Sequence, residues 1–263
     1  RLDRMGSSFP TRLSFMRTLI RRMSKESWKF ERTLRNVDKD GYGVSVYSAI
    51  TPKRTYSLIA FTQEIPADMR TDRVIAEVWD ATFSLFDGVP TQDDIDYLSN
   101  NTPKQEGGRY RPSELVLARA NKSLRVFENI ISSLSSGVQP DLELISSVGY
   151  LMRTTAVYGS GKFGCADRAK IADRDECKAP FQIELLAVYL IRWFTIDSVE
   201  ELAKERGGNQ AVRLDKSIRQ FIGVGNSTGL GMAPFLLKHP TLIHNWVVAK
   251  ETALARVRSI ETA

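Results

Sequence analysis

The sequence predicts a mainly α-helical fold, a multi-helix orthogonal bundle with one small β-hairpin near residues 43–62. Three observations lead to this prediction. Apolar residues recur every three to four positions over most of the chain, which is the spacing of one face of an α-helix. Prolines and glycine pairs stand where these periodic segments begin and end. Only residues 43–62 show the pattern of paired strands.

The first predicted helix, residues 10–24, is amphipathic and basic. Its apolar stripe consists of Leu13, Met16, Ile20 and Met23. Its other face and the residues that follow carry Arg12, Arg17, Arg21, Arg22, Lys25 and Lys29. Two interpretations stay open: a solvated face over a packed stripe, or a surface that binds an acidic protein, nucleic acid or a membrane.

The hairpin is predicted from residues 44–50 and 56–61, where β-branched and aromatic residues alternate or cluster on either side of a turn at residues 51–54. An isolated two-stranded hairpin is only marginally stable, so we expect it to pack against helices. Because no other segment repeats the pattern, any sheet is expected to be small.

The rest of the chain is predicted to be helical between breaks. Helical spacing of apolar residues predicts helices over residues 74–86, 112–135, 140–153, 181–206, 213–222 and 240–260, and a short acidic helix over 91–98. Residues 101–111, which contain Pro103 and the pair Gly107-Gly108, predict a loop or soft boundary. It would separate an N-terminal part (1–100) from a helical core (112–263), unless the chain is a single domain.

Composition and charge restrict the class of protein. A net charge of +6 without a run of five basic residues does not predict nucleic-acid binding. Two cysteines, Cys165 and Cys177, are too few for a disulfide framework, and no apolar run reaches the ~20 residues that span a bilayer. We therefore expect a cytoplasmic protein without a transmembrane segment. The sequence identifies no cofactor and is compatible with a homo-oligomer.

The first of two glycine-rich connectors, residues 159–164, contains G-x-G-x-x-G directly after Tyr158. In dinucleotide-binding folds this motif follows a strand of a βαβ unit. Here the preceding segment is predicted to be helical, so dinucleotide binding is not expected. Lys162, together with Arg153 upstream, would supply positive charge to a carboxylate or phosphate. The structural alternatives are a helix terminator and an ion pair for Arg153.

The second connector, residues 223–231, combines four glycines with Asn226, Ser227 and Thr228. Such a loop can present several amides and hydroxyls to one anion or oxyanion. Close packing of backbones is the structural alternative. His239 follows the connector and is a candidate general acid or base, because histidine titrates near neutral pH.

Other kinds of site are not predicted. His239 and His244 are five residues apart and do not share a helical face, and no zinc-binding spacing accompanies them. The second connector lacks the G-x-S-x-G of a serine hydrolase. The alternating charges of residues 167–176 predict an exposed helix or turn with salt bridges rather than a cation site.

The residues after the second connector carry one short resemblance. Met232-Ala-Pro234 and Lys238-His-Pro240 resemble the Ser-Ser-x-Met-Pro-x-Lys-x-Asn-Pro loop of the fumarase and aspartase superfamily, which are helical lyases acting on dicarboxylates. In that family Met and Pro are adjacent, whereas here Ala233 separates them. The likeness covers a small part of the chain, so membership is not predicted.

These features lead to one functional hypothesis and one alternative. The hypothesis is an enzyme or enzyme-like protein, of lyase or transferase type, that binds a small anionic metabolite between the two connectors. The candidate residues are Arg153, Tyr158, Lys162, Asn226 and Thr228 for ligand binding and Ser227 and His239 for catalysis, with no metal. The alternative is a non-catalytic helical interaction module that uses the basic N-terminal helix.

Overall fold

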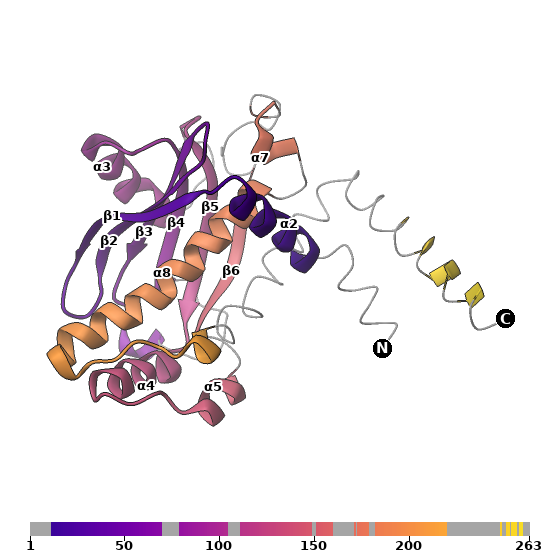
Figure 1. Cartoon of the computed structure of the whole chain (residues 1–263). Coiled ribbons are helices and arrows are strands. Elements are labelled where there is room, and N and C mark those ends of the chain that lie inside the picture. The colour runs from indigo at the N-terminus through magenta and orange to yellow at the C-terminus, as the bar shows by residue number, and fades with distance from the viewer. Residues whose placement is uncertain are drawn as a thin grey trace.

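An antiparallel sheet of six strands, in the order β1-β2-β3-β4-β5-β6, forms the centre of the computed structural model (Figure 1). The structure describes residues 12–69, 79–104, 111–148, 151–159, 171, 173–178 and 182–219, and also 248, 251–252, 254–256 and 258–259. Helices lie against both faces of the sheet. The prediction of a mainly α-helical bundle with one small hairpin is therefore wrong, since the described part is a mixed fold of helices and a large sheet.

Each strand pairs with the strands next to it in the sequence. The strands are β1 (Lys29–Val37), β2 (Gly43–Ile50), β3 (Thr55–Thr62), β4 (Ala81–Asp87), β5 (Glu114–Lys122) and β6 (Met152–Gly159). The predicted hairpin is confirmed as β2 and β3, with Ile50 opposite Thr55 and Gly43 opposite Thr62. The predicted soft boundary at residues 101–111 lies between β4 and β5, which pair with each other.

The strands that the sequence did not predict have a common physical reason. Nearly every residue of β3, β4 and β5 is buried, because both faces of these strands are covered. A strand buried on both faces loses the alternation of apolar and polar residues and cannot be told from a buried helix by periodicity. The helix predicted over 74–86 is therefore wrong over residues 81–86, and the one predicted over 112–135 is wrong over residues 114–122.

Several predicted helices are present. The structure contains α2 (Arg12–Lys25), α3 (Gln92–Asn101), α4 (Leu124–Ser135), α5 (Leu142–Val148), α7 (Asp175–Lys178) and α8 (Gln182–Gly207), with short 3-10 turns at Ala67–Met69, Thr102–Lys104 and Gly208–Gln210. Those predicted over 10–24, 91–98 and 181–206 are confirmed as α2, α3 and α8. The helix predicted over 140–153 is confirmed only as α5, because β6 begins at Met152. Residues 216–219 of the segment predicted over 213–222 are helical.

The long helix α8 covers one face of the sheet, and α3 covers part of the other (Figure 1). Along β3, Leu58 and Ala60 belong to the larger core with α8, whereas Ile59 and Phe61 belong to the smaller core with α3. Phe194 of α8 is central to the larger core. The centroid of its ring lies 5.4 Å from the ring centroid of Phe83 and 5.9 Å from that of Tyr47, and both ring pairs are edge-to-face. Helices α2 and α4 pack against α8 on the same side of the sheet.

Candidate functional site

One end of the sheet gathers the termini of five strands. The register places Ile50 opposite Thr55, Tyr56 opposite Asp87, Phe86 opposite Glu114 and Val116 opposite Gly159. The turn between β2 and β3, the end of β4, the start of β5 and the end of β6 therefore lie together. We call this region, marked by residues 51–56, Asp87, Glu114 and Gly159, the polar sheet end.

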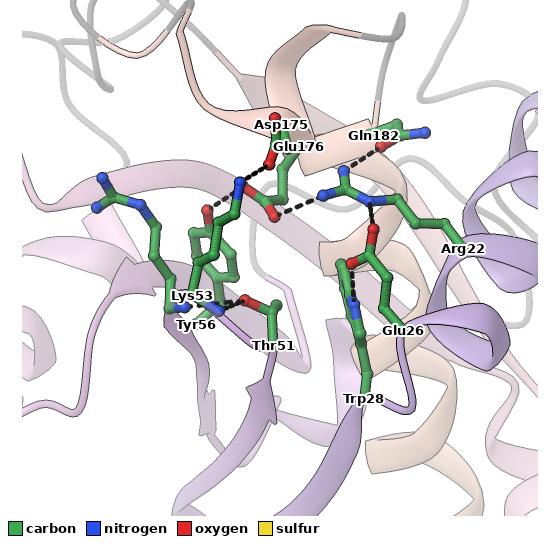
Figure 2. Close-up of polar contacts among 10 residues, drawn as sticks. Arg22, Glu26, Trp28, Thr51, Lys53, Tyr56, Asp175, Glu176 and Gln182 are labelled. Carbon is green, nitrogen blue, oxygen red and sulfur yellow. Dashed lines mark hydrogen bonds and ion pairs between the residues drawn. The ribbon is translucent and has the colours of Figure 1, made fainter.

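Three consecutive residues, Arg174 and the first two residues of α7, are each bonded to the polar sheet end. Arg174 Nη2 donates to Asp87 at 2.6 Å. Lys53 Nζ lies 2.5 Å from an oxygen of Asp175, and Tyr56 Oη donates to Glu176 Oε2 at 2.8 Å (Figure 2). These bonds fix the chain at residues 174–176 against β3, β4 and the turn between β2 and β3.

The carboxylate of Glu176 is buried, with 3% of the residue exposed, and it also contacts Arg22 of helix α2 (Figure 2). Arg22 Nη2 lies 3.1 Å from Glu176 Oε1, Nη1 donates to Gln182 at 3.0 Å, and Nε donates to Glu26 at 2.8 Å. Trp28 Nε1 donates to the other oxygen of Glu26 at 2.7 Å. One guanidinium thus joins α2, α7 and the first residue of α8; we call these five residues the Arg22 network.

Burial and charge set the protonation states in this region. Burial raises the pKa of Tyr56, and the hydrogen bond to Glu176 and its charge raise it further, so Tyr56 stays a donor. Burial acts to lower the pKa of Arg22, but the bonds and charges of Glu26 and Glu176 raise it above its ordinary value. The same balance, with Asp87 as the first partner and Tyr56 as the second, raises the pKa of Arg174. Both arginines are therefore fully charged.

Arg174 has a donor without an acceptor. Its Nη1 is buried and makes no hydrogen bond within the part of the chain that the structure describes, although Nη2 is bound to Asp87. Only 15% of the Arg174 side chain is exposed. A buried charged donor that lacks an acceptor is costly, and the oxygen of an anion would satisfy it.

Two exposed cations lie beside Arg174. Arg54 Nη1 lies 4.0 Å from Asp87 Oδ1, at the limit of an ion pair, and 74% of the Lys53 side chain is exposed. Together with Arg174 and Arg22 these side chains carry four positive charges, and Glu26, Asp87, Asp175 and Glu176 carry four negative charges. The unsatisfied donor of Arg174, and not a net positive charge, is therefore what favours an anion here. The arrangement suits a carboxylate or phosphate, which arginine binds through two parallel hydrogen bonds.

A second buried carboxyl, Glu114, lies at the polar sheet end on the face opposite α8. It is 1% exposed, accepts the backbone N–H of Arg111 at 2.7 Å and lies 3.5 Å from Ser84 Oγ. The guanidinium of Arg111 is directed to Asp94 instead. Burial raises the pKa of Glu114 to about 7, so this group exchanges a proton near neutral pH.

The structure places two of the ligand-binding residues predicted from the sequence. Arg153 and Tyr158 are in β6, opposite Asn121 and Leu117. Six residues of strand separate Arg153 from Gly159, roughly 20 Å, so Arg153 lies at the far end of β6 from the polar sheet end. The remaining predicted site residues, Lys162, Asn226, Ser227, Thr228 and His239, lie outside the described residues, as does the second connector.

The local context of the first connector differs from the prediction. The G-x-G-x-x-G motif follows strand β6, which ends at Gly159, and not a helix. The βαβ unit of a dinucleotide-binding fold is nevertheless absent from the described strands, because every pair in the sheet is antiparallel.

The residues that form the polar sheet end are not identified by the sequence patterns. The alternating charges at 173–176 correctly indicate salt bridges, but the predicted exposure is wrong for Glu176, which is buried. Helical spacing groups Arg22 with the outward basic face of its helix, yet it binds inside the Arg22 network. Glu114 and Asp87 lie in segments predicted as helix or helix end. A charged residue directly before the apolar run 115–118 is the available signal for Glu114.

The described residues contain neither a metal-binding group nor a membrane-spanning helix. No group of three His, Cys, Asp or Glu side chains there could hold a metal ion. None of the described helices combines the length and apolar character that a membrane span requires. In comparisons with known proteins, no family model, no curated protein and no solved structure matches this chain.

Proposed function

We propose that this protein is an enzyme or enzyme-like protein that binds a small anionic metabolite, a carboxylate or phosphate, at the polar sheet end. Arg174 is the principal contact, and Arg54 and Lys53 form the rim. The observation that carries the proposal is the buried Nη1 of Arg174, which has no acceptor among the described residues while Asp87 holds Nη2.

The energetics support an anion at this position. A buried donor without an acceptor costs about 1–3 kcal/mol, and more when it is charged. An anionic oxygen at Nη1 would remove this cost and add a charge-assisted hydrogen bond. Asp87 keeps the guanidinium oriented before the ligand arrives, so little of the binding free energy is lost in ordering the arginine.

The first connector starts at the same place, because β6 delivers Gly159 to the polar sheet end. We therefore include Lys162 and the amides of residues 159–164 in the proposed site, with Tyr158 beside them. Asn226, Ser227, Thr228 and His239 complete the proposal as residues of the second connector and its flank. Arg153 is left out because of its place at the far end of β6.

The test measures thermal unfolding of the full chain with sulfate, phosphate or succinate. At one hundred times its dissociation constant, a ligand stabilises the folded state by about 2.7 kcal/mol. We expect at least one of these anions to raise the melting temperature of the wild type, and the substitution Arg174→Gln to abolish the increase.

The matched control is Arg206→Gln, which removes a guanidinium from an exposed ion pair with Glu128 on α4. It should keep the full response to the anion. A wild type that responds to none of the three anions, or an Arg174→Gln variant that responds like the wild type, would contradict the proposal.

The alternative function, an interaction module built on the basic N-terminal helix, has less support. Arg22 is turned inward and neutralised by Glu26 and Glu176, and Leu19 and Met23 are buried in the core. Helix α2 therefore offers fewer basic side chains to a partner than its sequence indicates.

A further inference from the structure

We infer that helix α2 is part of the proposed anion site, because Arg22 is a positioning residue that fixes Arg174 through Glu176. The inference rests on the proposed function and names the element that holds the anion-binding guanidinium in place. The connection from Arg22 to Arg174 passes through the carboxylate of Glu176 and the backbone of residues 174–176.

The first step is the covalent link between Glu176 and Arg174. Glu176 follows Arg174 by two residues, and its carboxylate has a bonded partner on each oxygen, Arg22 on Oε1 and Tyr56 on Oε2. A buried carboxylate held at both oxygens fixes its own backbone. Any displacement of Glu176 therefore displaces Arg174 relative to Asp87.

The second step is the contribution of α2. Tyr56 is fully buried near the start of β3, an inner strand of the sheet, so the adjustable partner of Glu176 is Arg22. Arg22 bridges Glu26, Glu176 and Gln182 at once (Figure 2). The three bonds start from three different nitrogens of the planar guanidinium, Nε, Nη1 and Nη2. A lysine ammonium has its three donors on one nitrogen and does not reproduce this spread.

The third step is that anion binding and docking of α2 affect each other. Helix α2 docks through the buried side chains of Leu19 and Met23 and through Arg22. If the docked helix favours the orientation of Arg174 that binds the anion, then the bound anion favours the docked helix by the same factor. Ligand binding and docking of α2 are thus coupled through Arg22 and Glu176.

The experiment measures the dissociation constant of sulfate by calorimetry on the full chain. We expect Arg22→Gln to weaken sulfate binding by about tenfold, within the usual range of such couplings. Arg22→Lys should recover only part of the affinity, because it keeps the charge but not the three bonds. Arg206→Gln again serves as the control with unchanged affinity.

A second readout separates positioning from a purely structural role. In the wild type, sulfate should slow amide hydrogen exchange in residues 19–23 of α2. In Arg174→Gln and in Arg22→Gln the exchange should not respond to sulfate. If Arg22 only stabilised the fold, its removal would speed exchange with and without sulfate but would leave the affinity unchanged.

The outcomes are distinguishable. Sulfate binding that is lost in Arg174→Gln but unchanged in Arg22→Gln overturns this inference and leaves the proposed function standing. A wild type that binds neither sulfate, phosphate nor succinate overturns both. Should Arg22→Gln fail to fold, Arg22→Lys and Glu26→Gln replace it, and wild-type affinity in both variants overturns the inference.

Discussion

Glu114 makes the stability of the protein depend on pH near neutrality. Burial raises its pKa from 4.5 to about 7 in the folded state, against the opposing effects of the Arg111 N–H, Ser84 and the Arg111 charge. Asp94 on α3 is the charged group that pairs with Arg111. Because the folded pKa is raised, this contribution to stability is complete below pH 4.5 and is lost as pH rises through 7.

The expected loss in the free energy of unfolding is roughly 3 kcal/mol, since a tenfold change in proton affinity corresponds to about 1.4 kcal/mol. Urea unfolding at pH 5, 6, 7 and 8 should show the free energy of unfolding falling with pH in the wild type. Glu114→Gln, which stays neutral, should show a flatter dependence. Equal slopes in the two proteins would mean that Glu114 is not the titrating group.

Single residues also show why the site was hard to predict. Arg22 lies on the predicted basic face of a helix, whereas Arg174 and Glu176 lie in a stretch of alternating charge. Both patterns usually form solvated surfaces. Whether a charged side chain is buried depends on what the distant parts of the chain place over it, here Tyr56 and Gln182. Helical spacing of the charges carries no information about those contacts.

Polar groups on the C-terminal half of helix α8 hold this helix to the outer strands β1 and β2. Asp197 accepts from Tyr47 Oη at 2.6 Å and from Arg32 at 2.7 Å. Tyr47 is fully buried, so Asp197→Ala would leave its hydroxyl without this acceptor. We expect a loss of about 1–3 kcal/mol in the free energy of unfolding.

Glu205→Ala is the matched comparison on the same helix. It removes the partner of Arg35 from an ion pair in which 42% of the glutamate side chain is exposed. Exposed pairs contribute about 0–1 kcal/mol. Urea unfolding of both variants should therefore rank Asp197→Ala well below Glu205→Ala in stability, and the reverse order would contradict this account of α8.

The C-terminal end of α8 depends on close approach to α4. A Cβ on Gly207 would lie 2.1 Å from the backbone oxygen of Ser135, whereas a Cβ on Gly208 meets nothing within 4 Å. Gly207→Ala should therefore cost about 1–3 kcal/mol or more through overpacking against backbone. Gly208→Ala carries only the left-handed backbone penalty, about 1–2 kcal/mol.

Thermal unfolding of the two alanine variants would measure this difference. A Gly207→Ala protein as stable as the wild type would show that the two helices are not in contact at this point.

At the scale of the whole molecule, the sequence predicted the elements that have strong local signals. The hairpin has a short turn between two β-rich runs, α3 has a capping box in which Thr91 and Asp94 bond each other's backbone, and α8 is long and continuous. The strands β4 and β5 have no such signal, because both of their faces are buried. The sequence did not predict β1 for the opposite reason, since β1 is a mostly polar edge strand.

The order of the strands in the sheet has a consequence for how the chain folds. Because every strand pairs with its neighbour in the sequence, the sheet can grow one strand at a time from local contacts, which favours rapid folding. The helix α8 that covers the sheet comes late in the chain. The hydrogen bond between Arg22 and Gln182, the first residue of α8, joins residues that are 160 positions apart. Until α8 is synthesised, the apolar face of the nascent sheet lacks its longest covering helix, and in this interval it is exposed to aggregation.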